Sequence, residues 1–238
     1  MKFFYDLHIH SCLSPCADDD ATPALIAGIA KVNGLDIVAL TDHNTCKNCP
    51  AFFTACEFYG ITPIAGMELT TAEDVHIICL FPTLEAAMEF DQIVEKHSAS
   101  IQNKPKIFGN QHIMNEEDEI TGEISRLLIV ATSISINDAV RIVRKMGGVA
   151  YPAHIDRDSN GIIAVLGDIP ADAGFTAAEI RDIIELEKYK ERYPILNTLN
   201  IISSSDAHGI AGVSGAVNYI ELPENTAASL VKNILTKK

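Results

Sequence analysis

Tryptophan and long apolar runs are both missing from this chain of 238 residues. No apolar stretch approaches the ~20 residues that a membrane-spanning helix needs, so we expect no membrane partner. The first residues also lack the apolar core of a signal peptide, because His8 and His10 follow closely behind Met1. Together these absences favour a cytoplasmic protein.

Basic residues are scarce as well. The chain has 18 Lys and Arg against 32 Asp and Glu, and the resulting net charge of -14 repels polyanions over most of the surface. Without Trp and without a stripe of Arg or Lys among aromatic residues, we expect no long nucleic acid as a partner. We expect a small phosphorylated substrate instead, since bound divalent cations would locally reverse the sign of the charge. The oligomeric state stays open.

Six cysteines are present, but a disulfide framework is not expected in a chain whose 47% apolar residues can build a full core. Cys12 and Cys16 follow the first predicted strand, and Cys46 and Cys49 follow the second. Paired spacings of this kind also occur in zinc and iron–sulfur sites, so a site built from four thiols is an alternative. Reduced, free thiols are the interpretation that we favour.

Short apolar strands alternate with helices along most of the chain. Strands are predicted at about 3–7, 35–40, 61–67, 75–81, 149–153, 200–204 and 216–222, and helices at about 22–31, 50–59, 83–96, 135–146 and 224–235. This alternation implies right-handed crossovers, a parallel sheet and an α/β fold in a single domain, 1–238. Residues 177–186 fit either a strand or a helix.

The stretch 97–132 breaks this rhythm. It holds the turn-forming pairs Lys104-Pro105, Gly109-Asn110 and Thr121-Gly122 and an acidic run at 116–119. We interpret it as a loop or hairpin inserted between strand–helix units, acting as a lid or an edge element.

Two histidines, His8 and His10, stand at the end of the first predicted strand. Because side chains alternate along a strand, this spacing points both imidazoles to the same face. Two imidazoles side by side make half of a transition-metal site. The remaining ligands are therefore expected at the ends of other strands.

Residues of the required types do follow the other predicted strands. His43, Glu68, Asp206 and His208 stand at strand ends, and Asp18, His76 and His154 lie nearby in the sequence. In a barrel of parallel strands these ends open onto one face, where barrel enzymes keep their active sites. A single buried histidine is more often a hydrogen-bonded core residue, but six of the eight histidines belong to this set. Histidine and carboxylate ligands together suit zinc, manganese or iron.

These residues occur in motifs that resemble the PHP family, named for polymerase and histidinol phosphatase. The motifs are His8-Ile9-His10-Ser11, Thr41-Asp42-His43, Gly66-Met67-Glu68, Val75-His76, Gly147-Gly148 with Ala153-His154, and Ser205-Asp206-Ala207-His208, in the family's order. The resemblance implies a distorted seven-stranded TIM-like β/α barrel. It also implies two or three divalent metal ions and phosphoesterase activity.

The resemblance further implies a ligand set. One metal would lie between His8, His10, Glu68 and Asp206, a second between Glu68, His76 and His154, and a third with Asp18, His43 and His208. Asp18 is chosen because it stands five residues before Pro23, as the family's aspartate does before its helix, and Asp19 is the alternative. The chain departs from the family at Ile155, where proline is common.

The chemistry expected from such a centre is hydrolysis of a phosphate ester by a hydroxide that the metals activate, without a protein nucleophile. Glu68, Asp206 and His208 are the candidate catalytic residues, Glu68 as a bridging ligand and the other two as ligands that also shuttle a proton. Arg157 is the candidate for gripping a phosphate, against the alternative of an ion pair with a neighbouring aspartate. Lys47 is a second candidate of the same kind.

Three other functions fit the same motifs. An exonuclease or oligonucleotide phosphodiesterase would use the same centre, and a histidinol-phosphate phosphatase is a narrower version of the small-substrate hypothesis. A metal-binding regulatory module without activity is the alternative from another class. No ligand is missing from the set, which favours an enzyme.

Overall fold

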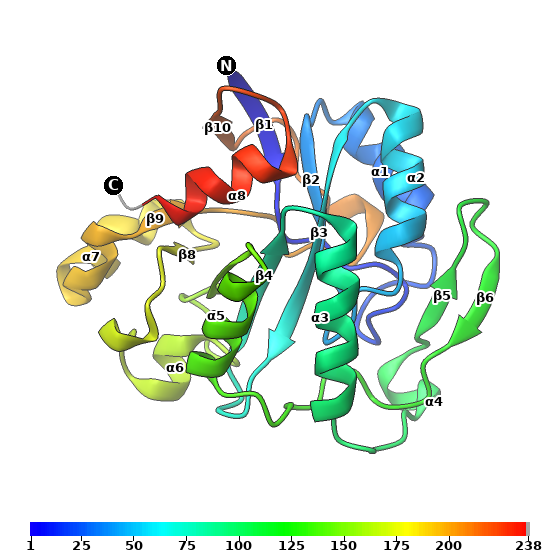
Figure 1. The fold of residues 1–238 in the computed structure, drawn as a ribbon, viewed down its shortest axis with the longest axis horizontal. Helices are drawn as coiled ribbons and strands as arrows, with labels where there is room; N and C mark the ends of the chain where they lie inside the picture. Colours follow the sequence, from blue (N-terminus) through cyan, green and yellow to red (C-terminus); the bar gives the residue numbers. More distant parts are fainter. Residues whose placement is uncertain (237–238) are drawn as a thin grey trace.

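A curved six-stranded sheet forms the centre of the protein in the computed structural model, which describes residues 1–236 (Figure 1). Its order is β10-β1-β2-β3-β4-β7. The strands are β1 (Lys2–Asp6), β2 (Ile37–Leu40), β3 (Thr62–Thr70), β4 (His76–Phe81), β7 (Val149–Pro152) and β10 (Tyr219–Glu221). The three strands β1, β2 and β3 run parallel, so their carboxyl ends lie at one edge.

A second, parallel pair of strands, β8 (Ala177–Glu179) and β9 (Asn200–Ile202), continues the curve of the sheet. The amide of Ile155, just after β7, donates to the carbonyl of Glu179, and Ile9 and Ala207 form a parallel bridge. The predicted α/β fold is therefore confirmed, as a curled half-barrel. The strands of this half-barrel belong to two separate hydrogen-bonded sheets, the six-stranded sheet and the β8-β9 pair.

The prediction of a parallel sheet is wrong at β4, which runs antiparallel to both β3 and β7, and at β10, which runs antiparallel to β1. Only residues 71–75 connect β3 to β4, and a parallel crossover needs a dozen or more residues. Thr71 donates its amide to the Val75 carbonyl in this turn. As a result His76, the first residue of β4, pairs with Thr70 at the edge where β1, β2 and β3 end.

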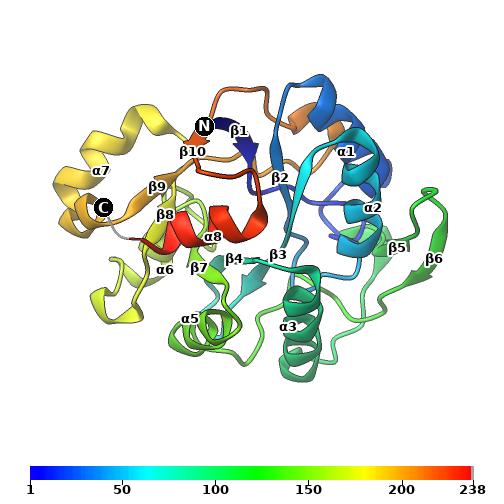
Figure 2. The same cartoon turned by 45° about the horizontal axis from the view of Figure 1, so that its top comes forward.

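Helices cover the outside of the sheet, and side-chain caps begin most of the long ones (Figure 2). Thr22, Thr83, Ser135 and Thr226 each accept a backbone N–H of the first turn that follows. The α-helices are α1 (Pro23–Val32), α2 (Cys49–Tyr59), α3 (Leu84–His97), α4 (Pro105–Phe108), α5 (Ile136–Lys145), α6 (Ile162–Leu166), α7 (Leu186–Arg192) and α8 (Ala227–Leu235). Short 3-10 turns span Ala171–Ala173, Ile183–Glu185, Pro194–Thr198 and Ile210–Gly212. None of the helices within residues 1–236 has the length and apolar character to cross a bilayer.

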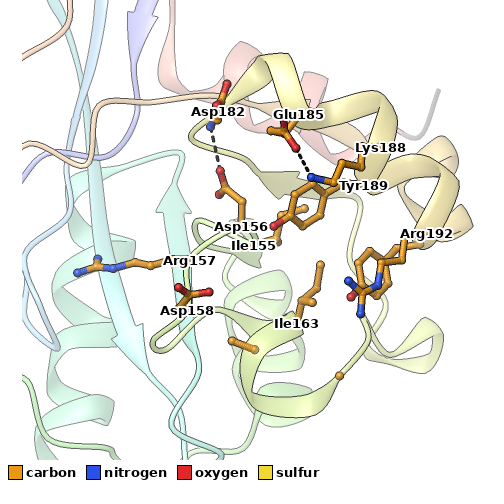
Figure 3. Close-up of a pocket in the computed structure, with 13 residues that line it drawn as sticks. Ile155, Asp156, Arg157, Asp158, Ile163, Asp182, Glu185, Lys188, Tyr189 and Arg192 are labelled. Carbon is orange, nitrogen blue, oxygen red and sulfur yellow. Dashed lines mark hydrogen bonds and ion pairs between the residues drawn. The ribbon is translucent and has the colours of Figure 1, made fainter.

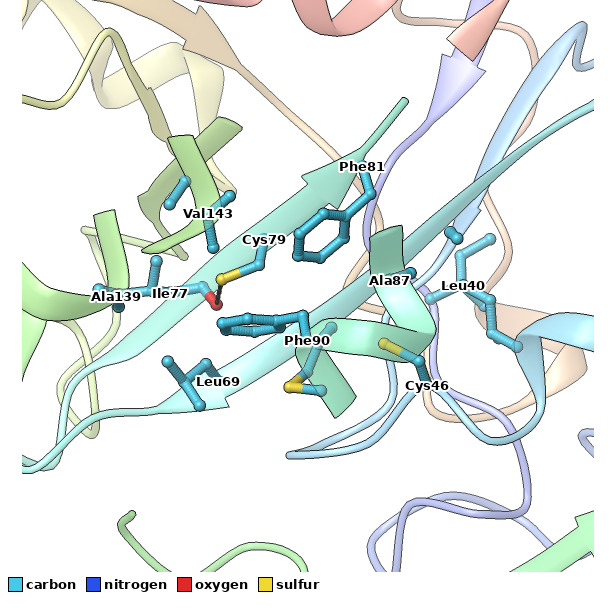
Figure 4. Close-up of a cluster of buried hydrophobic side chains, with 14 of the residues drawn as sticks. Leu40, Cys46, Leu69, Ile77, Cys79, Phe81, Ala87, Phe90, Ala139 and Val143 are labelled. Carbon is cyan, nitrogen blue, oxygen red and sulfur yellow. Dashed lines mark hydrogen bonds between the residues drawn. The ribbon is translucent and has the colours of Figure 1, made fainter. Parts of the chain in front are cut away.

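The main core lies between the sheet and these helices. Figure 4 shows Phe90 of α3 packed against Cys79 and Phe81 of β4. The two phenylalanine rings lie 5.2 Å apart and are fully buried. Burial of one such side chain contributes about 1.5–3 kcal/mol to stability. This packing holds rigid the strands whose ends carry the polar site.

Residues 97–132 contain α4 and a hairpin of β5 (His112–Met114) and β6 (Ile120–Glu123), whose strands pair only with each other among the described residues. The hairpin lies beside the loop that follows β1. His112 donates its amide to the Cys12 carbonyl, and Asp118 accepts from the Thr22 hydroxyl at 2.7 Å. The segment therefore supports the loop between β1 and α1.

Candidate metal centre

The two histidines after β1 face one another. Their Nε2 atoms are 3.1 Å apart, and both side chains are fully buried. The other ring nitrogen of each is held by the protein: His8 Nδ1 lies 2.9 Å from Glu179 Oε1, and His10 Nδ1 lies 3.0 Å from Ser14 Oγ. Donation through Nδ1 leaves both Nε2 lone pairs available for a cation.

Glu68 is the common neighbour of five imidazoles. It lies on β3 and is 1% exposed. Its carboxylate oxygens are 2.8 Å from His76 Nδ1, 2.9 Å from His154 Nε2, 3.0 Å from His43 Nδ1, 3.3 Å from His10 Nε2 and 3.5 Å from His8 Nε2. The structure thus brings the predicted bridging carboxylate and the predicted histidines of two metal positions together.

Asp206 and His208 complete this cluster from the loop after β9. Asp206 Oδ1 lies 3.4 Å from His8 Nε2 and 3.6 Å from His10 Nε2. The His208 ring stacks on His10 with 4.2 Å between the ring centres. His208 Nδ1 lies 2.9 Å from the Asp206 carbonyl oxygen, which leaves its Nε2 free.

Two residues of the cluster have left-handed backbone conformations. His154 has φ of 27° and Asp206 has φ of 53°. Such a conformation costs a residue with a Cβ of order 1–3 kcal/mol and concentrates at functional sites. Both side chains contact cluster residues, so the surrounding structure maintains this strain at the positions that complete the site.

Two buried carboxylates that support the cluster were missed from the sequence. Glu179 ends β8 and also accepts the His154 amide at 3.2 Å. Asp42 accepts the Ser11 amide, the Ser11 hydroxyl and the Ser14 hydroxyl, each at 2.7 Å. Ser14 in turn contacts His10. Asp42 lies within a motif named above, whereas the ambiguous pattern at 177–186 gave no signal for Glu179.

The electrostatics of the cluster keep Glu68 ionised and favour positive charge beside it. Burial would raise the pKa of Glu68, but His76, His8 and His43 outweigh it and hold that pKa well below its usual range. Burial, followed by the proximity of His10, lowers the pKa of His208 to about 4. Burial would lower the pKa of His8, but Glu179 and Glu68 raise it well above 6.5. The negative charge of these carboxylates therefore favours a positive charge at His8, which either a bound proton or a metal ion could supply.

The predicted aspartate ligand lies at the rim of the cluster. Asp18 is exposed, its amide donates to the His208 carbonyl, and its carboxylate lies against Gly209. Asp19 instead accepts a hydrogen bond from the Asn110 side chain at 2.8 Å. Of the two alternatives, Asp18 is therefore the one next to the histidines.

The two predicted phosphate-binding side chains lie in different places. Arg157 reaches the cluster, with its guanidinium 3.2 Å from Asp206 Oδ2, so it pairs with a cluster residue and not with its sequence neighbours. The Lys47 ammonium instead lies 3.4 Å from Glu95 and 3.5 Å from Asp91, both on α3. The structure therefore does not bring Lys47 to the cluster.

The four cysteines of the alternative zinc or iron–sulfur site do not meet. Cys46 and Cys49 both point to the Gly66 carbonyl inside the core, at 3.2 and 3.8 Å. Cys12 lies 4.0 Å from the His112 carbonyl, and Cys16 is exposed. All six thiols are free.

The residues present fit a multinuclear metal centre. Three overlapping sets each have ligand atoms within 4.8 Å of one another: His10 with His43 and His208, His8 with His10 and Glu68, and His43 with Glu68 and His76. His43 Nδ1 and Asp206 Oδ1 are buried without a hydrogen-bond partner among the described residues. Buried polar atoms without partners are costly, and a cation would satisfy them.

A family model of the PHP domain matches residues 6–235. The chain belongs to the PHP domain family. This confirms the resemblance read from the motifs.

Two relatives have names that describe enzymes acting on nucleic acids. The PolC-type DNA polymerase III of Bacillus subtilis is 24% identical over 221 residues, 82% of this chain and 14% of the polymerase. A 5'-3' exoribonuclease of Haemophilus influenzae is 25% identical over 158 residues, 60% of this chain and 56% of the relative. This PHP chain therefore spans about one seventh of the length of the polymerase and about half of the length of the exoribonuclease.

Solved structures share the fold at low identity. Endonuclease Q of Pyrococcus furiosus matches 99% of this chain and 56% of its own with a TM-score of 0.66 and 20% identity. A second structure is endonuclease Q in complex with a 27-mer duplex that has an abasic lesion at the active site. The match covers 98% of this chain and 56% of the endonuclease chain, with a TM-score of 0.65 and 20% identity. A third match is a proposed metal-dependent phosphoesterase of Bifidobacterium adolescentis. It covers 97% of this chain and 95% of the phosphoesterase chain, with a TM-score of 0.58 and 19% identity.

Sequence analysis led us to expect a small phosphorylated substrate and no long nucleic acid as a partner. The comparisons contradict that expectation, because several of the similar proteins are named for nucleic acids. Endonuclease Q, which shares this fold, is described in complex with a 27-mer duplex that has an abasic lesion at the active site, so the negative net charge of this chain does not exclude a nucleic acid. The chain also contains a local basic and aromatic run, Lys188-Tyr189-Lys190-Glu191-Arg192-Tyr193, contrary to the expected absence of such a stripe. Net charge averages over the surface, whereas a ligand meets the charges near the site.

Proposed function

We propose that this PHP domain is a metal-dependent phosphodiesterase that hydrolyses nucleic acid. The observation that carries the proposal is Glu68, a single buried carboxylate within 3.5 Å of five imidazoles. That arrangement, next to an arginine at the surface, suits cations on one side and a phosphate on the other. The names of the relatives support a nucleic acid as the source of the phosphate.

Three groups of residues would hold the ions. His8, His10, Glu68 and Asp206 would bind one, Glu68, His76 and His154 a second, and His43, His208 and Asp18 a third. Nitrogen and oxygen ligands of this kind suit zinc, manganese or iron. When bound, the ions supply Lewis acidity and lower the pKa of water from 15.7 toward about 7.

The remaining chemistry belongs to the side chains. The Arg157 guanidinium pairs with Asp206 through one nitrogen, so its other N–H groups can donate to the oxygens of a phosphate. His208, whose pKa is lowered to about 4, is neutral at pH 7, so its Nε2 lone pair is available to one of the ions. Asp206, held ionised by His10 and His8 despite its burial, fixes both neighbours in place.

We also infer that the chain forms a distorted seven-stranded barrel, made of β1, β2, β3, β4, β7, β8 and β9. The barrel would be a single domain, 1–238, and residues 97–132 would be an insertion in it. The Ile9–Ala207 bridge and the hydrogen bond from Ile155 to Glu179 support this. Six free cysteines support a reducing compartment such as the cytoplasm.

The proposal is tested with metal-stripped protein reconstituted with zinc, manganese or iron. Hydrolysis of bis(p-nitrophenyl) phosphate reports on the centre itself, and cleavage of labelled single- and double-stranded DNA and RNA reports on the substrate. We expect Glu68→Gln to reduce both by about a thousandfold or more. Glu123→Gln is the matched control, because Glu123 is 61% exposed and pairs with His112 on the hairpin. Metal-replete protein that cleaves no phosphodiester would overturn the proposal.

A further inference from the structure

A hollow of about 540 Å³ lies beside the metal centre, between α6, α7 and the loop after His154 (Figure 3). This volume suits a ligand of the size of a nucleoside. Its walls include the apolar side chains of Ile155 and Ile163 and the half-buried ring of Tyr189. Tyr193 stands behind Tyr189, with 6.1 Å between the ring centres and 30° between the planes.

The polar groups of the hollow carry little net charge. Three basic and four acidic side chains line it. Asp156 is already used by the fold, since its carboxylate accepts the amides of Arg181 and Asp182. Glu185 pairs with Lys188 at 2.6 Å. A balanced lining of this kind does not favour a phosphate, but it suits a neutral ligand with hydrogen-bonding edges and a flat aromatic face.

Arg157 connects the hollow to the metal centre. It lines the hollow, yet Figure 3 shows its side chain pointing away from the other lining side chains. Its guanidinium ends 3.2 Å from Asp206. A phosphate held by Arg157 at the centre would therefore place the rest of its nucleotide at the mouth of the hollow.

We propose that this hollow binds the nucleoside that flanks the scissile phosphate, with the base stacked on Tyr189. The inference rests on the proposed function and adds to it the position of one base of the substrate. Stacking is indifferent to base identity, because every base has an aromatic face. The site therefore requires a base at this position without selecting its sequence.

The test uses metal-reconstituted full-length protein and the variants Tyr189→Ala and Tyr189→Phe. Tyr219→Ala is the matched control, since Tyr219 is a 51% exposed tyrosine on β10 outside this hollow. The substrates are bis(p-nitrophenyl) phosphate and a set of short labelled oligonucleotides that each lack one base. Binding of the same oligonucleotides is followed by fluorescence anisotropy, which does not depend on cleavage.

We expect Tyr189→Ala to weaken oligonucleotide binding and raise KM roughly tenfold, while Tyr189→Phe and Tyr219→Ala change little. Hydrolysis of bis(p-nitrophenyl) phosphate stays at the wild-type rate in the control Tyr219→Ala. Removal of one particular base beside the scissile phosphate gives the same loss in the wild type and no further loss in Tyr189→Ala.

Other results overturn the inference. If the losses from Tyr189→Ala and from base removal add, or if Tyr189→Ala binds and cleaves as the wild type does, the base lies elsewhere. A wild-type protein that binds the oligonucleotide through Tyr189 but cleaves nothing refutes the proposed function and leaves the nucleoside site standing. A protein that binds no oligonucleotide refutes the site even if it hydrolyses bis(p-nitrophenyl) phosphate.

Discussion

Glu179 holds His8 in place: its Oε1 lies 2.9 Å from His8 Nδ1, and both side chains are fully buried. The same carboxylate accepts the amide of His154, so it connects two of the predicted metal positions. A metal-ligating histidine usually donates its other ring N–H to such a group, which fixes the tautomer and the orientation of the ring.

Glu179→Ala should therefore lower metal affinity by about 10- to 100-fold although Glu179 is not a predicted ligand. The measurement is competition of metal-loaded protein with a chromogenic chelator at constant pH. Glu185→Ala serves as the comparison, because the Glu185 carboxylate pairs with Lys188 and contacts none of the predicted metal ligands. Unchanged affinity in Glu179→Ala would show that His8 needs no such support.

Removal of the metals should destabilise the fold. A ligand at a thousand times its Kd stabilises a protein by about 4 kcal/mol, and about 1 kcal/mol shifts the Tm of a domain of this size by ~2–4 °C. We therefore expect excess chelator to lower the Tm by roughly 8–16 °C, as measured by scanning calorimetry. Glu68→Gln should respond to chelator much less, and an equal response in the two proteins would place the metals away from Glu68.

The thiol of Cys16 should report on the charge of the centre. Desolvation, and then the negative charge of Glu68, raise its pKa from 9.0 to about 12. The thiolate is the reactive form, and this rise lowers its fraction at pH 8 about a thousandfold. Alkylation of Cys16 in metal-free protein should thus be slow at pH 8 and accelerate as the pH rises toward 12.

Bound cations beside Glu68 reverse this effect, because positive charge lowers the pKa of the thiol. Metal loading should accelerate alkylation of Cys16 at pH 8, as followed by mass spectrometry with Cys16→Ser as the control. The other five cysteines are buried and should not react in the folded protein. Identical rates with and without metal would mean that no cation binds near Cys16.

Much of the site could be predicted because its information is local. His8, His10 and Asp206 follow apolar strands, Glu68 lies near the end of one, and parallel strand ends meet at one edge. The helix caps at Thr22 and Ser135 were equally readable from their own side chains. For such features a few neighbouring residues decide the structure.

The parts that could not be predicted depend on distant contacts. Glu179 ends a strand of three residues, too short to give a period, and its role comes from His8, 171 residues away. Lys47 follows a predicted ligand in sequence, but Asp91 and Glu95 of α3 draw it away. The hollow beside α7 joins two segments that lie apart in the sequence, 155–167 and 182–193.

The most direct test of the account is a titration of metal-stripped protein with Mn²⁺ while cleavage of a labelled oligonucleotide is followed. We predict no cleavage without metal and a rate that saturates at two to three equivalents per chain. Cleavage that persists in the stripped protein, or its absence at saturating zinc, manganese and iron alike, would contradict hydrolysis at a metal centre around Glu68.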